Sequence, residues 1–495
     1  MIDICFNEIW FITGSQHLYG TKILTKVAVH TEDIVKSLNS NSEILVLIKN
    51  KGVVTTPEEI TSICQISNND KNCIGLIFWM HTFSPAKMWI NGLKLLNKPF
   101  IHLHTQYNSE IPWSKIDMDF MNLNQSAHGD REFGFICSRL KINRKVVVGH
   151  WKDSKVIDKI NIWSRVASAH HDAKSGKVAR IGDNMREVAV TEGDKVEAQI
   201  KFGYSVNGYG VGDLIEYIKM VSDAEMKNLI DEYESTYFIS KELKYDGAKR
   251  GSLEDAARIE IGLGNFMREG NFTSFTDTFE NLHGLTQLPG IAAQRLMNQG
   301  YGFAGEGDWK TAALVRTMKV MAAGLKGGNS FMEDYTYHFS HGNDRVLGSH
   351  MLEICPSIAW GEVKCEIHPL GIGGREDPVR LVFDAAEGEA LNASIVDMGG
   401  RMRMVVNNVT TVKSKGGLPH LPTARALWNV KPNLKEGAQA WILAGGSHHT
   451  CFSQNLSNEY LDDYCDMVGI EIVTIDEKTD INTLKSELRV NSSFY

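Results

Sequence analysis

Residues 306–350 gather several side chains that could hold a metal ion and move protons. Two further imidazoles, His448 and His449, follow a turn at residues 445–447. Carboxylate oxygens mixed with imidazole nitrogens are typical of Mn²⁺, Fe²⁺ or Mg²⁺ sites rather than of a thiolate zinc site. The candidate ligands are Glu306, Asp308, Glu333, Asp334, His338, His341, His350, His448 and His449.

The local sequence around two glutamates favours a metal site over a chance cluster. Acidic side chains are mostly exposed in proteins, and 17 histidines in a chain of 495 residues will group somewhere without a function. Glu306, however, lies between two glycines, and Glu333 lies within the apolar and aromatic run 331–335. A buried carboxylate without a partner is unfavourable, and a divalent cation would offset that cost. Spacing alone leaves the metal site open, and these surroundings favour it.

The histidine pair is expected to divide its roles. If the apolar run 439–443 is a strand that continues near the following turn, neighbouring side chains face opposite sides of it. One imidazole would then reach the metal, while the other packs or holds a ligand in place.

Two glycine-rich segments, residues 208–212 and 302–307, have the spacing of phosphate-binding loops. A Walker loop needs Lys and then Ser or Thr after its last glycine, whereas Gly307 is followed by Asp308 and Trp309. A dinucleotide loop should not direct an acid such as Glu306 at a pyrophosphate. We therefore expect no nucleotide here, and instead a backbone that approaches another group closely.

The first part of the chain predicts a parallel sheet covered by helices. Short apolar runs alternate with segments of helical periodicity, which is typical of βαβ units. The predicted strands are residues 8–13, 43–48, 74–80, 99–104 and 145–148, and the predicted helices include 21–38 and 57–66, the latter capped by Thr56. Ligands of such a sheet bind beyond the carboxyl ends of its strands, where Gln16, His17, His81 and Phe83 would lie.

The pattern restarts near residue 177 and changes after about residue 325. Helices are predicted at 211–220, 222–234, 252–268 and 288–299, which indicates a second α/β domain. Residues 378–384 and 391–407 alternate in the manner of antiparallel strands, and a helix at 456–467 with a strand at 470–474 closes the chain. We predict an N-terminal α/β domain over 1–176, a central α/β domain over 177–326 and a mainly β domain over 327–495.

Composition excludes several classes of protein. With 43% apolar and 23% charged residues, the chain is neither a long disordered segment, nor collagen, nor a coiled coil. The net charge of −8 argues against a nucleic-acid partner, and no apolar run is long enough to span a membrane. The N-terminus does not resemble a secretory signal, and eight cysteines include no C-x-x-C pair. We expect a cytoplasmic protein.

Blocks distributed along the whole chain resemble the L-arabinose isomerase family. They are WFITGSQHLY at 10–19, HTFSPAKMWIN at 81–91, DMDFMNLNQ at 117–125, GDNMREVAV at 182–190, GFAGEGDWK at 302–310, SFMEDYTYH at 330–338, GSHMLE at 348–353 and GGSHHT at 445–450. The resemblance implies an aldose–ketose isomerase that converts L-arabinose to L-ribulose through an enediol, as the first step of L-arabinose catabolism. It also implies an α/β fold with two Rossmann-like domains followed by a mainly β, antiparallel, barrel-like C-terminal domain.

The same resemblance implies the cofactor, the assembly and the site. It implies one Mn²⁺ per subunit and a homohexamer built as a dimer of trimers, with active sites between subunits. The implied metal ligands are Glu306, Glu333, His350 and His449, of which the two glutamates also transfer protons. The implied sugar contacts are Gln16, Leu18, Phe83, Gln125, His128, Met185, Phe279, Phe331 and Tyr335, and several of these on the N-terminal domain would serve a neighbouring subunit.

The residue types suit this chemistry. A metal that chelates O1 and O2 of the sugar stabilises the charge of the enediolate, and two carboxylates can serve as base and acid and exchange roles on reversal. Two glutamates and two histidines leave about two octahedral positions for adjacent sugar oxygens. The alternatives are a related isomerase of the fucose type and a non-catalytic sugar-binding protein. The latter has no need of a carboxylate pair with a metal.

Overall fold

The computed structural model describes residues 2–340, 342–414 and 416–494, and the chain forms two compact units. The N-terminal unit comprises Asp3–His171 and Glu459–Gly469. The main unit comprises Met1–Ile2, Asp172–Asn458 and Ile470–Tyr495. Within the described residues, no helix is both long enough and apolar enough to cross a membrane.

The N-terminal unit is built on a parallel sheet of five strands in the order β2-β1-β3-β4-β5. Its strands are β1 (Glu8–Gly14), β2 (Leu47–Val54), β3 (Cys73–Met80), β4 (Phe100–His104) and β5 (Lys145–Val148). Four of the predicted strands are confirmed, but the one predicted at 43–48 is wrong, since β2 starts at Leu47. This strand lies at the sheet edge, where water can solvate polar residues such as Lys49 and Asn50, so its apolar content is a poor guide to its position.

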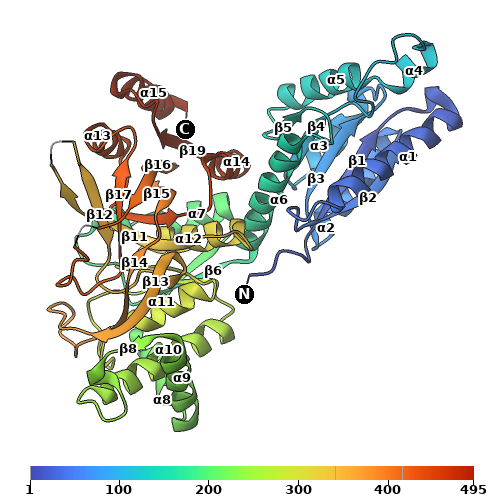
Figure 1. Cartoon of the computed structure of the whole chain (residues 1–495). Helices are drawn as coiled ribbons and strands as arrows, with labels where there is room; N and C mark the ends of the chain where they lie inside the picture. The colour runs from blue at the N-terminus through green and yellow to red at the C-terminus, as the bar shows by residue number, and fades with distance from the viewer. Residues whose placement is uncertain (1, 341, 415, 495) are drawn as a thin grey trace. The chain divides into compact units, whose positions relative to one another are not determined.

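Helices α1, α2 and α5 pack on the strands of this sheet (Figure 1). The helices of this unit are α1 (Gly20–Asn39), α2 (Pro57–Asn69), α3 (Ile90–Leu95), α4 (Met118–Leu123), α5 (Ser126–Arg139), most of α6 (Ser154–Ser175) and nearly all of α14 (Asn458–Val468), with short 3-10 turns η1 (His17–Tyr19) and η2 (Ala86–Trp89). The predicted cap is confirmed, because the Thr56 side chain accepts from the Glu59 amide while the Glu59 side chain accepts from the Thr56 amide. Buried Trp10, Phe78 and Phe133 belong to the core between helices and sheet.

The main unit contains a second parallel sheet, in the order β10-β9-β6-β7. Its strands are β6 (Lys177–Ile181), β7 (Ser205–Tyr209), β9 (Ser274–Thr276) and β10 (Gly302–Ala304). The helices of this region are α7 (Lys195–Phe202), α8 (Val211–Lys219), α9 (Asp223–Thr236), α10 (Arg250–Glu269), α11 (Gly290–Asn298) and α12 (Trp309–Met321), with η3 (Ala189–Thr191) and η4 (Lys241–Leu243). The four helices predicted here are confirmed as α8, α9, α10 and α11.

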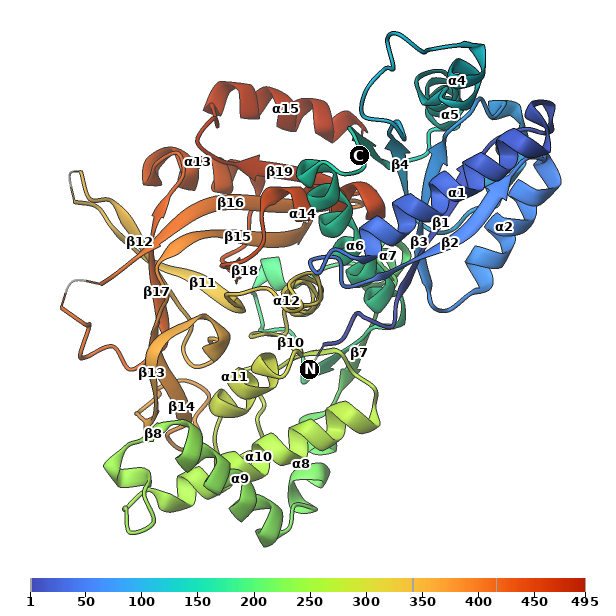
Figure 2. The same ribbon diagram turned by 45° about the vertical axis from the view of Figure 1, so that its right-hand side comes forward.

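A mixed sheet of ten strands forms the rest of the main unit. Its strands are β8 (Phe238–Ile239), β11 (Asn329–His338), β12 (Arg345–Ser349), β13 (Ala359–Ile367), β14 (Val379–Ala385), β15 (Gly388–Asp397), β16 (Met402–Val412), β17 (Arg425–Val430), β18 (His449–Ser453) and β19 (Glu471–Ile475). Figure 2 shows the long strands β15 and β16 side by side. An additional pairing of β16 with β17 closes a ring of antiparallel pairs through β15, β18, β11 and β12.

The strand considered at 439–443 is wrong, because these residues belong to helix α13 (Leu434–Ala444). Asn433 caps this helix, and Gly445 ends it in the left-handed conformation, so the following strand, β18, begins only at His449. The helix predicted at 456–467 and the strand predicted at 470–474 are confirmed as α14 and β19. Two further elements, η5 (Pro356–Ile358) and helix α15 (Ile481–Phe494), complete the chain.

Helix α12 explains why the central and C-terminal regions form one unit. Its residues are buried around almost the whole circumference of the helix. It packs on β9 and β10 of the second sheet and also on β11, β15 and β18 of the third. A helix shared by two sheets joins their cores. The three-domain division proposed from the sequence stays a prediction.

Candidate metal centre

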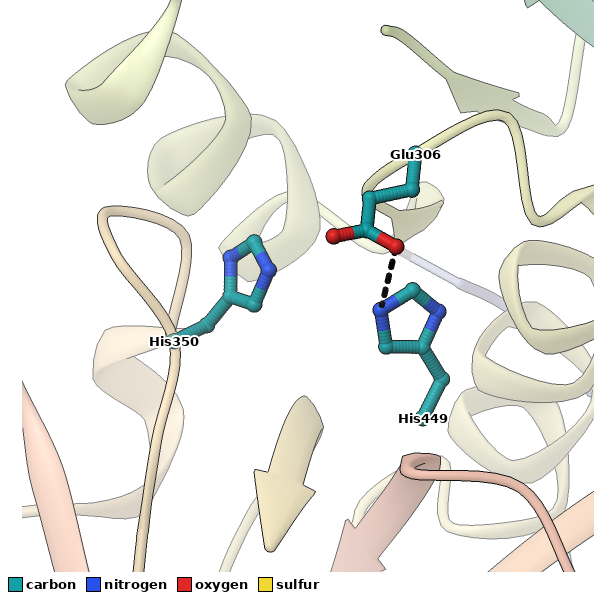
Figure 3. Close-up of side chains that lie close together, drawn as sticks. All are labelled: Glu306, His350 and His449. Atoms are coloured by element: carbon teal, nitrogen blue, oxygen red, sulfur yellow. Dashed lines mark ion pairs between the residues drawn. The ribbon is translucent and has the colours of Figure 1, made fainter. Parts of the chain in front are cut away.

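Three side chains of the main unit meet at a point suited to a metal ion. One ligand atom each from Glu306, His350 and His449 lies within 4.8 Å of the others, and Figure 3 shows both imidazoles facing the Glu306 carboxylate. Glu306 lies between β10 and α12, His350 directly follows β12, and His449 begins β18. Three segments distant in sequence thus converge. Among the described residues, no other set of three or more His, Cys, Asp or Glu side chains brings its ligand atoms this close together.

The backbone holds Glu306 in an unfavourable conformation. Its φ is +62°, in the left-handed region that side chains with a Cβ rarely adopt. Backbone hydrogen bonds enforce it, because the Glu306 carbonyl accepts from the Met185 amide at 3.1 Å and the Gly307 amide donates to the Asp277 carbonyl at 2.7 Å. A strained residue fixed by its surroundings is typical of a functional site.

The imidazole of His449 is fixed by a carboxylate on its far side. Its Nδ1 lies 3.1 Å from Oδ2 of Asp308, the residue that caps α12. Burial alone would raise the pKa of Asp308, but Lys310 and His449 outweigh it and hold that pKa at about 2. His449 Nε2 is buried without a hydrogen-bond partner and lies 3.8 Å from Glu306 Oε2. The free nitrogen therefore points to the site, as in carboxylate–histidine–metal arrangements.

His350 is held in the same way. Its Nδ1 lies 2.5 Å from Oε2 of Glu353, and both side chains are buried. Burial alone would lower the pKa of His350, but the Glu353 carboxylate outweighs it and raises that pKa. Phe331 packs against both histidines, with ring centroids 4.8 Å from His350 and 5.0 Å from His449, and Phe279 stacks on His350 at 5.9 Å. Apolar rings thus exclude water around the donor atoms.

Both members of the histidine pair approach Glu306, and the position of His448 beside this candidate ligand agrees with the expected division of roles. His448 Nε2 lies 3.6 Å from Glu306 Oε2, and His448 is partly exposed whereas His449 is fully buried. Burial alone would raise the pKa of Glu306, but the neighbouring histidines outweigh it and lower that pKa. The nearby Glu306 carboxylate raises the pKa of His448. The carboxylate at the centre of the group is therefore negatively charged.

Glu333 lies outside the group of three, although it is close to it in the sheet. On β11 it is directly opposite His449 of β18 on one side and Ser349 of β12 on the other. Directly opposed residues have Cβ atoms about 5 Å apart. Its negative charge raises the pKa values of His350 and His448. The role of Glu333 as a ligand stays a prediction.

The remaining ligand candidates do not join the group. Asp334 follows Glu333 on the strand, so its side chain faces the other side, and burial raises its pKa to about 7. His338 is exposed at the end of β11. His341 lies outside the described residues.

Four of the implied sugar contacts belong to the main unit and adjoin the group. Met185 bonds to the Glu306 backbone, and Phe279 and Phe331 contact the histidine rings. Tyr335 on β11 is 49% exposed and lines a cavity together with His350.

The other five lie in the N-terminal unit, on the segments that follow β1 and β3 and at the start of helix α5. They are Gln16, Leu18, Phe83, Gln125 and His128. Phe83 stacks on His128 with centroids 4.4 Å apart, and the Gln125 amide donates to the His81 carbonyl. A 2.7 Å hydrogen bond between the Ser15 and Thr82 hydroxyls joins the two strand ends. Side chains that follow different strands are thus assembled at one edge of the sheet.

The sequence did not assign two carboxylates that orient the histidines. Asp308 was a candidate ligand, but its oxygen contacts the far nitrogen of His449. Glu353 ends one of the blocks quoted above and was not singled out. Its position three residues after His350 was the available signal, because this spacing allows a local carboxylate–imidazole contact.

Three family models match consecutive parts of the chain. They describe the L-arabinose isomerase N-terminal domain at residues 4–175, the central domain at 177–324 and the C-terminal domain at 328–471.

Full-length relatives carry the same description. The chain is 60% identical to the L-arabinose isomerase of Flavobacterium johnsoniae, 59% to that of Herpetosiphon aurantiacus and 58% to that of Geobacillus stearothermophilus. Each alignment covers 100% of this chain and 99% of the relative.

Proposed function

The chain belongs to the L-arabinose isomerase family, and from this premise we propose how its residues carry out the reaction. The reaction interconverts the aldose L-arabinose and the ketose L-ribulose, and it opens the catabolism of L-arabinose. It moves one proton between C2 and C1 and another between the two oxygens on these carbons. The protein must therefore supply groups that accept and donate protons beside a polarised carbonyl.

We infer that Glu306, His350 and His449, joined by Glu333, hold one Mn²⁺ per subunit. One observation carries this proposal: the buried Nε2 of His449 has no hydrogen-bond partner and faces the ionised Glu306. The mixed oxygen and nitrogen donors suit Mn²⁺. When bound, the cation would act as a Lewis acid toward adjacent oxygens of the sugar.

The two glutamates are proposed to transfer the protons. Ionised Glu306 can accept a proton, and Glu333 on β11 can act as its counterpart, so that the sugar passes through an enediol. The roles reverse in the opposite direction, as microscopic reversibility requires. Asp308 and Glu353 hold the two imidazoles from behind and keep their free nitrogens directed at the site.

We further propose that the active enzyme is a cytoplasmic homohexamer, a dimer of trimers. Gln16, Phe83 and His128 would then complete the site of a neighbouring subunit. All eight cysteines have free thiols, in keeping with a reducing compartment. The closed ring of strand pairs supports a barrel-like C-terminal region, and the two parallel sheets support Rossmann-like N-terminal and central regions.

A ketose assay tests the reaction. Purified protein with added Mn²⁺ should form L-ribulose from L-arabinose, and it should act far less well on L-fucose. Loss of the C2 hydrogen to solvent should accompany turnover. Preference for L-fucose would favour the fucose-type alternative, and tight binding of L-arabinose without any ketose would favour a sugar-binding protein.

A further inference from the structure

A cavity of about 290 Å³ adjoins the candidate metal centre within the main unit. Its lining includes His350 and Tyr335, and most of the exposed lining is apolar. Small-molecule pockets typically range upward from about 300 Å³, so this cavity can take part of a sugar. Three further segments complete its walls, at Met351, at residues 369–372 and at residues 421–423.

One buried arginine connects these three segments. Arg380 on β14 is 2% exposed and lines the same cavity. Its Nη1 donates to the carbonyls of Met351 at 3.1 Å and Pro422 at 3.4 Å, and its Nη2 donates to the carbonyl of His368 at 2.9 Å. Each acceptor belongs to, or directly precedes, a different wall segment.

Only arginine suits this arrangement. A planar guanidinium presents several donors in a fixed fork, whereas a lysine ammonium is a single point of charge on a flexible stem. Burial lowers the pKa of Arg380 to about 10, partly opposed by the negative charges of Glu353, Asp377 and Glu366, so the group stays charged at neutral pH. A buried charge is a weak source of stability compared with an apolar side chain of similar volume. A role in shaping the cavity accounts for its presence better than stability does.

A second contact strengthens the link between the walls and the metal centre. The Ser349 hydroxyl, next to His350 in the sequence, forms a 2.8 Å hydrogen bond with the Thr423 hydroxyl and donates to the Ala424 carbonyl. The wall at 421–423 is therefore tied on one side to the segment that carries His350 and on the other to Arg380.

We infer that Arg380 is a positioning residue that fixes the subsite for the end of the sugar farthest from the candidate metal ligands. The inference rests on the proposed function. If O1 and O2 are held near Glu306 and His350, the remaining carbons must extend into adjoining space, and this cavity opens beside His350. Its walls then limit the length of the sugar, and Arg380 keeps those walls in place.

The test compares Arg380→Lys and Arg380→Gln with wild type and with Arg403→Lys. Arg403 is a similarly buried arginine of the same sheet, but its guanidinium donates to Glu471 and to the Ala444 carbonyl, neither of which lines the cavity. For each protein, kcat and KM are measured with Mn²⁺ on L-arabinose and on an aldohexose of the same configuration at C2–C4. Calorimetry gives the affinity for Mn²⁺ alone and for L-arabitol, a five-carbon polyol that cannot isomerise.

We expect the Arg380 variants to raise KM for L-arabinose and Kd for L-arabitol about tenfold, with kcat and Mn²⁺ affinity changed much less. The ratio of kcat/KM for the pentose to kcat/KM for the hexose should change in the Arg380 variants. Arg403→Lys should lower Tm but leave this ratio unchanged. Leu421→Ala enlarges the cavity at the same wall, so it should also change the preference for the pentose over the hexose. This variant is the test if the Arg380 variants do not fold.

Two results would overturn the inference, and they are distinguishable from failure of the proposed function. Equal loss of kcat and Mn²⁺ affinity with an unchanged sugar preference would make Arg380 a general structural residue. If Leu421→Ala leaves the preference for the pentose over the hexose unchanged, the cavity is not part of the sugar-binding site. Wild-type protein that forms no L-ribulose refutes the proposed function itself, and the inference with it.

Discussion

The candidate metal centre is built in the opposite way to the N-terminal cluster (Gln16, Leu18, Phe83, Gln125 and His128). In the metal centre the two histidines are buried and are held from behind, His449 by Asp308 and His350 by Glu353. In the N-terminal unit, Leu18 is 83% exposed and Phe83 stacks on an exposed His128. The first group is assembled within the main unit, whereas the second includes strongly exposed side chains of the N-terminal unit.

This difference separates two requirements of the proposed reaction. A metal centre needs donors fixed before the ion arrives, because mobile ligands weaken binding. Groups that touch only one end of a sugar can be supplied by a surface that closes over the site, and an exposed aromatic pair is suited to that. We therefore expect changes to the metal centre to abolish chemistry, and changes to the N-terminal cluster to be correctable by a second copy.

Removal of divalent ions should have the largest effect on activity, because it empties the candidate metal centre and leaves the N-terminal cluster unchanged. After exhaustive chelation we expect no turnover of L-arabinose and a lower Tm, with recovery on adding Mn²⁺. An ion at 100 times its Kd stabilises the folded state by about 2.7 kcal/mol. Elemental analysis must confirm the metal-free state. Full activity in verified metal-free protein would contradict the metal proposal.

Substitution of the two glutamates should cause the second-largest loss of activity. Glu306→Gln and Glu333→Gln each keep the volume and remove the titratable group, and we expect each to lower kcat by about 10²–10⁴-fold. The double variant should cost little more, because the pair acts as a unit. Since Glu306 belongs to the group of three and Glu333 does not, Glu306→Gln should weaken Mn²⁺ binding more.

The measurement is exchange of C2 deuterium from labelled L-arabinose into water, recorded beside metal occupancy. A variant that keeps near-normal exchange with metal bound would leave its glutamate without a role in proton transfer. His128 would then be the first alternative base.

Subunit mixing tests the N-terminal cluster. His128→Ala and Glu306→Ala proteins should each be inactive and regain activity when assembled together, since random pairing in equal amounts leaves about one intact site in four. Glu306→Ala mixed with Glu333→Ala is the matched control and should stay inactive, because both glutamates belong to the main unit. If verified mixed oligomers of the first pair stay inactive, the two residues serve a site within one chain.

Strongly periodic elements could be predicted from the sequence, and elements with mixed surroundings could not. The buried strand β3 and the four helices α8–α11 are apolar where they pack, so their periodicity is clear. Helix α13 was considered as a strand because residues 439–443 are a short apolar run, and such a run does not distinguish the two structures. Helix α12 is buried on nearly all sides, and no local pattern predicts that two sheets share it.

The site shows the same limit. Residue types alone left nine candidate ligands, and the resemblance to the family reduced them to Glu306, Glu333, His350 and His449. The structure brings Glu306, His350 and His449 together. Their fixed orientation depends on Asp308 and Glu353, whose oxygens point the way they do only in the folded backbone. The positive φ of Glu306 likewise arises from hydrogen bonds to residues far away in sequence, such as Met185.

The smallest expected effect concerns the acid sensitivity of the N-terminal unit. His81 is buried, stacks on Trp79 and lies with Nε2 2.7 Å from Nδ1 of His30. Burial and the neighbouring His30 lower the pKa of His81 to about 3. The unfolded chain takes up this proton near pH 6.5 while the folded chain does not, so the stability that the neutral ring contributes is present above pH 6.5 and is lost as the pH falls toward 3.

We therefore expect His81→Gln to reduce the loss of stability on acidification, by up to about 1.4 kcal/mol per pH unit below pH 6. Calorimetric melts of chelated protein from pH 7 to pH 4.5 measure this, with the exposed His283→Gln as control. The titrations of the metal-centre histidines are common to all three proteins and cancel in the comparison. His81→Gln should melt slightly lower than wild type at pH 7, since it loses the ring contacts, and the two curves should converge at acid pH. Parallel curves would show that His81 takes up its proton in the folded unit, and the backbone contact between His81 and Gln125 would then lie beside a charged histidine rather than a neutral one.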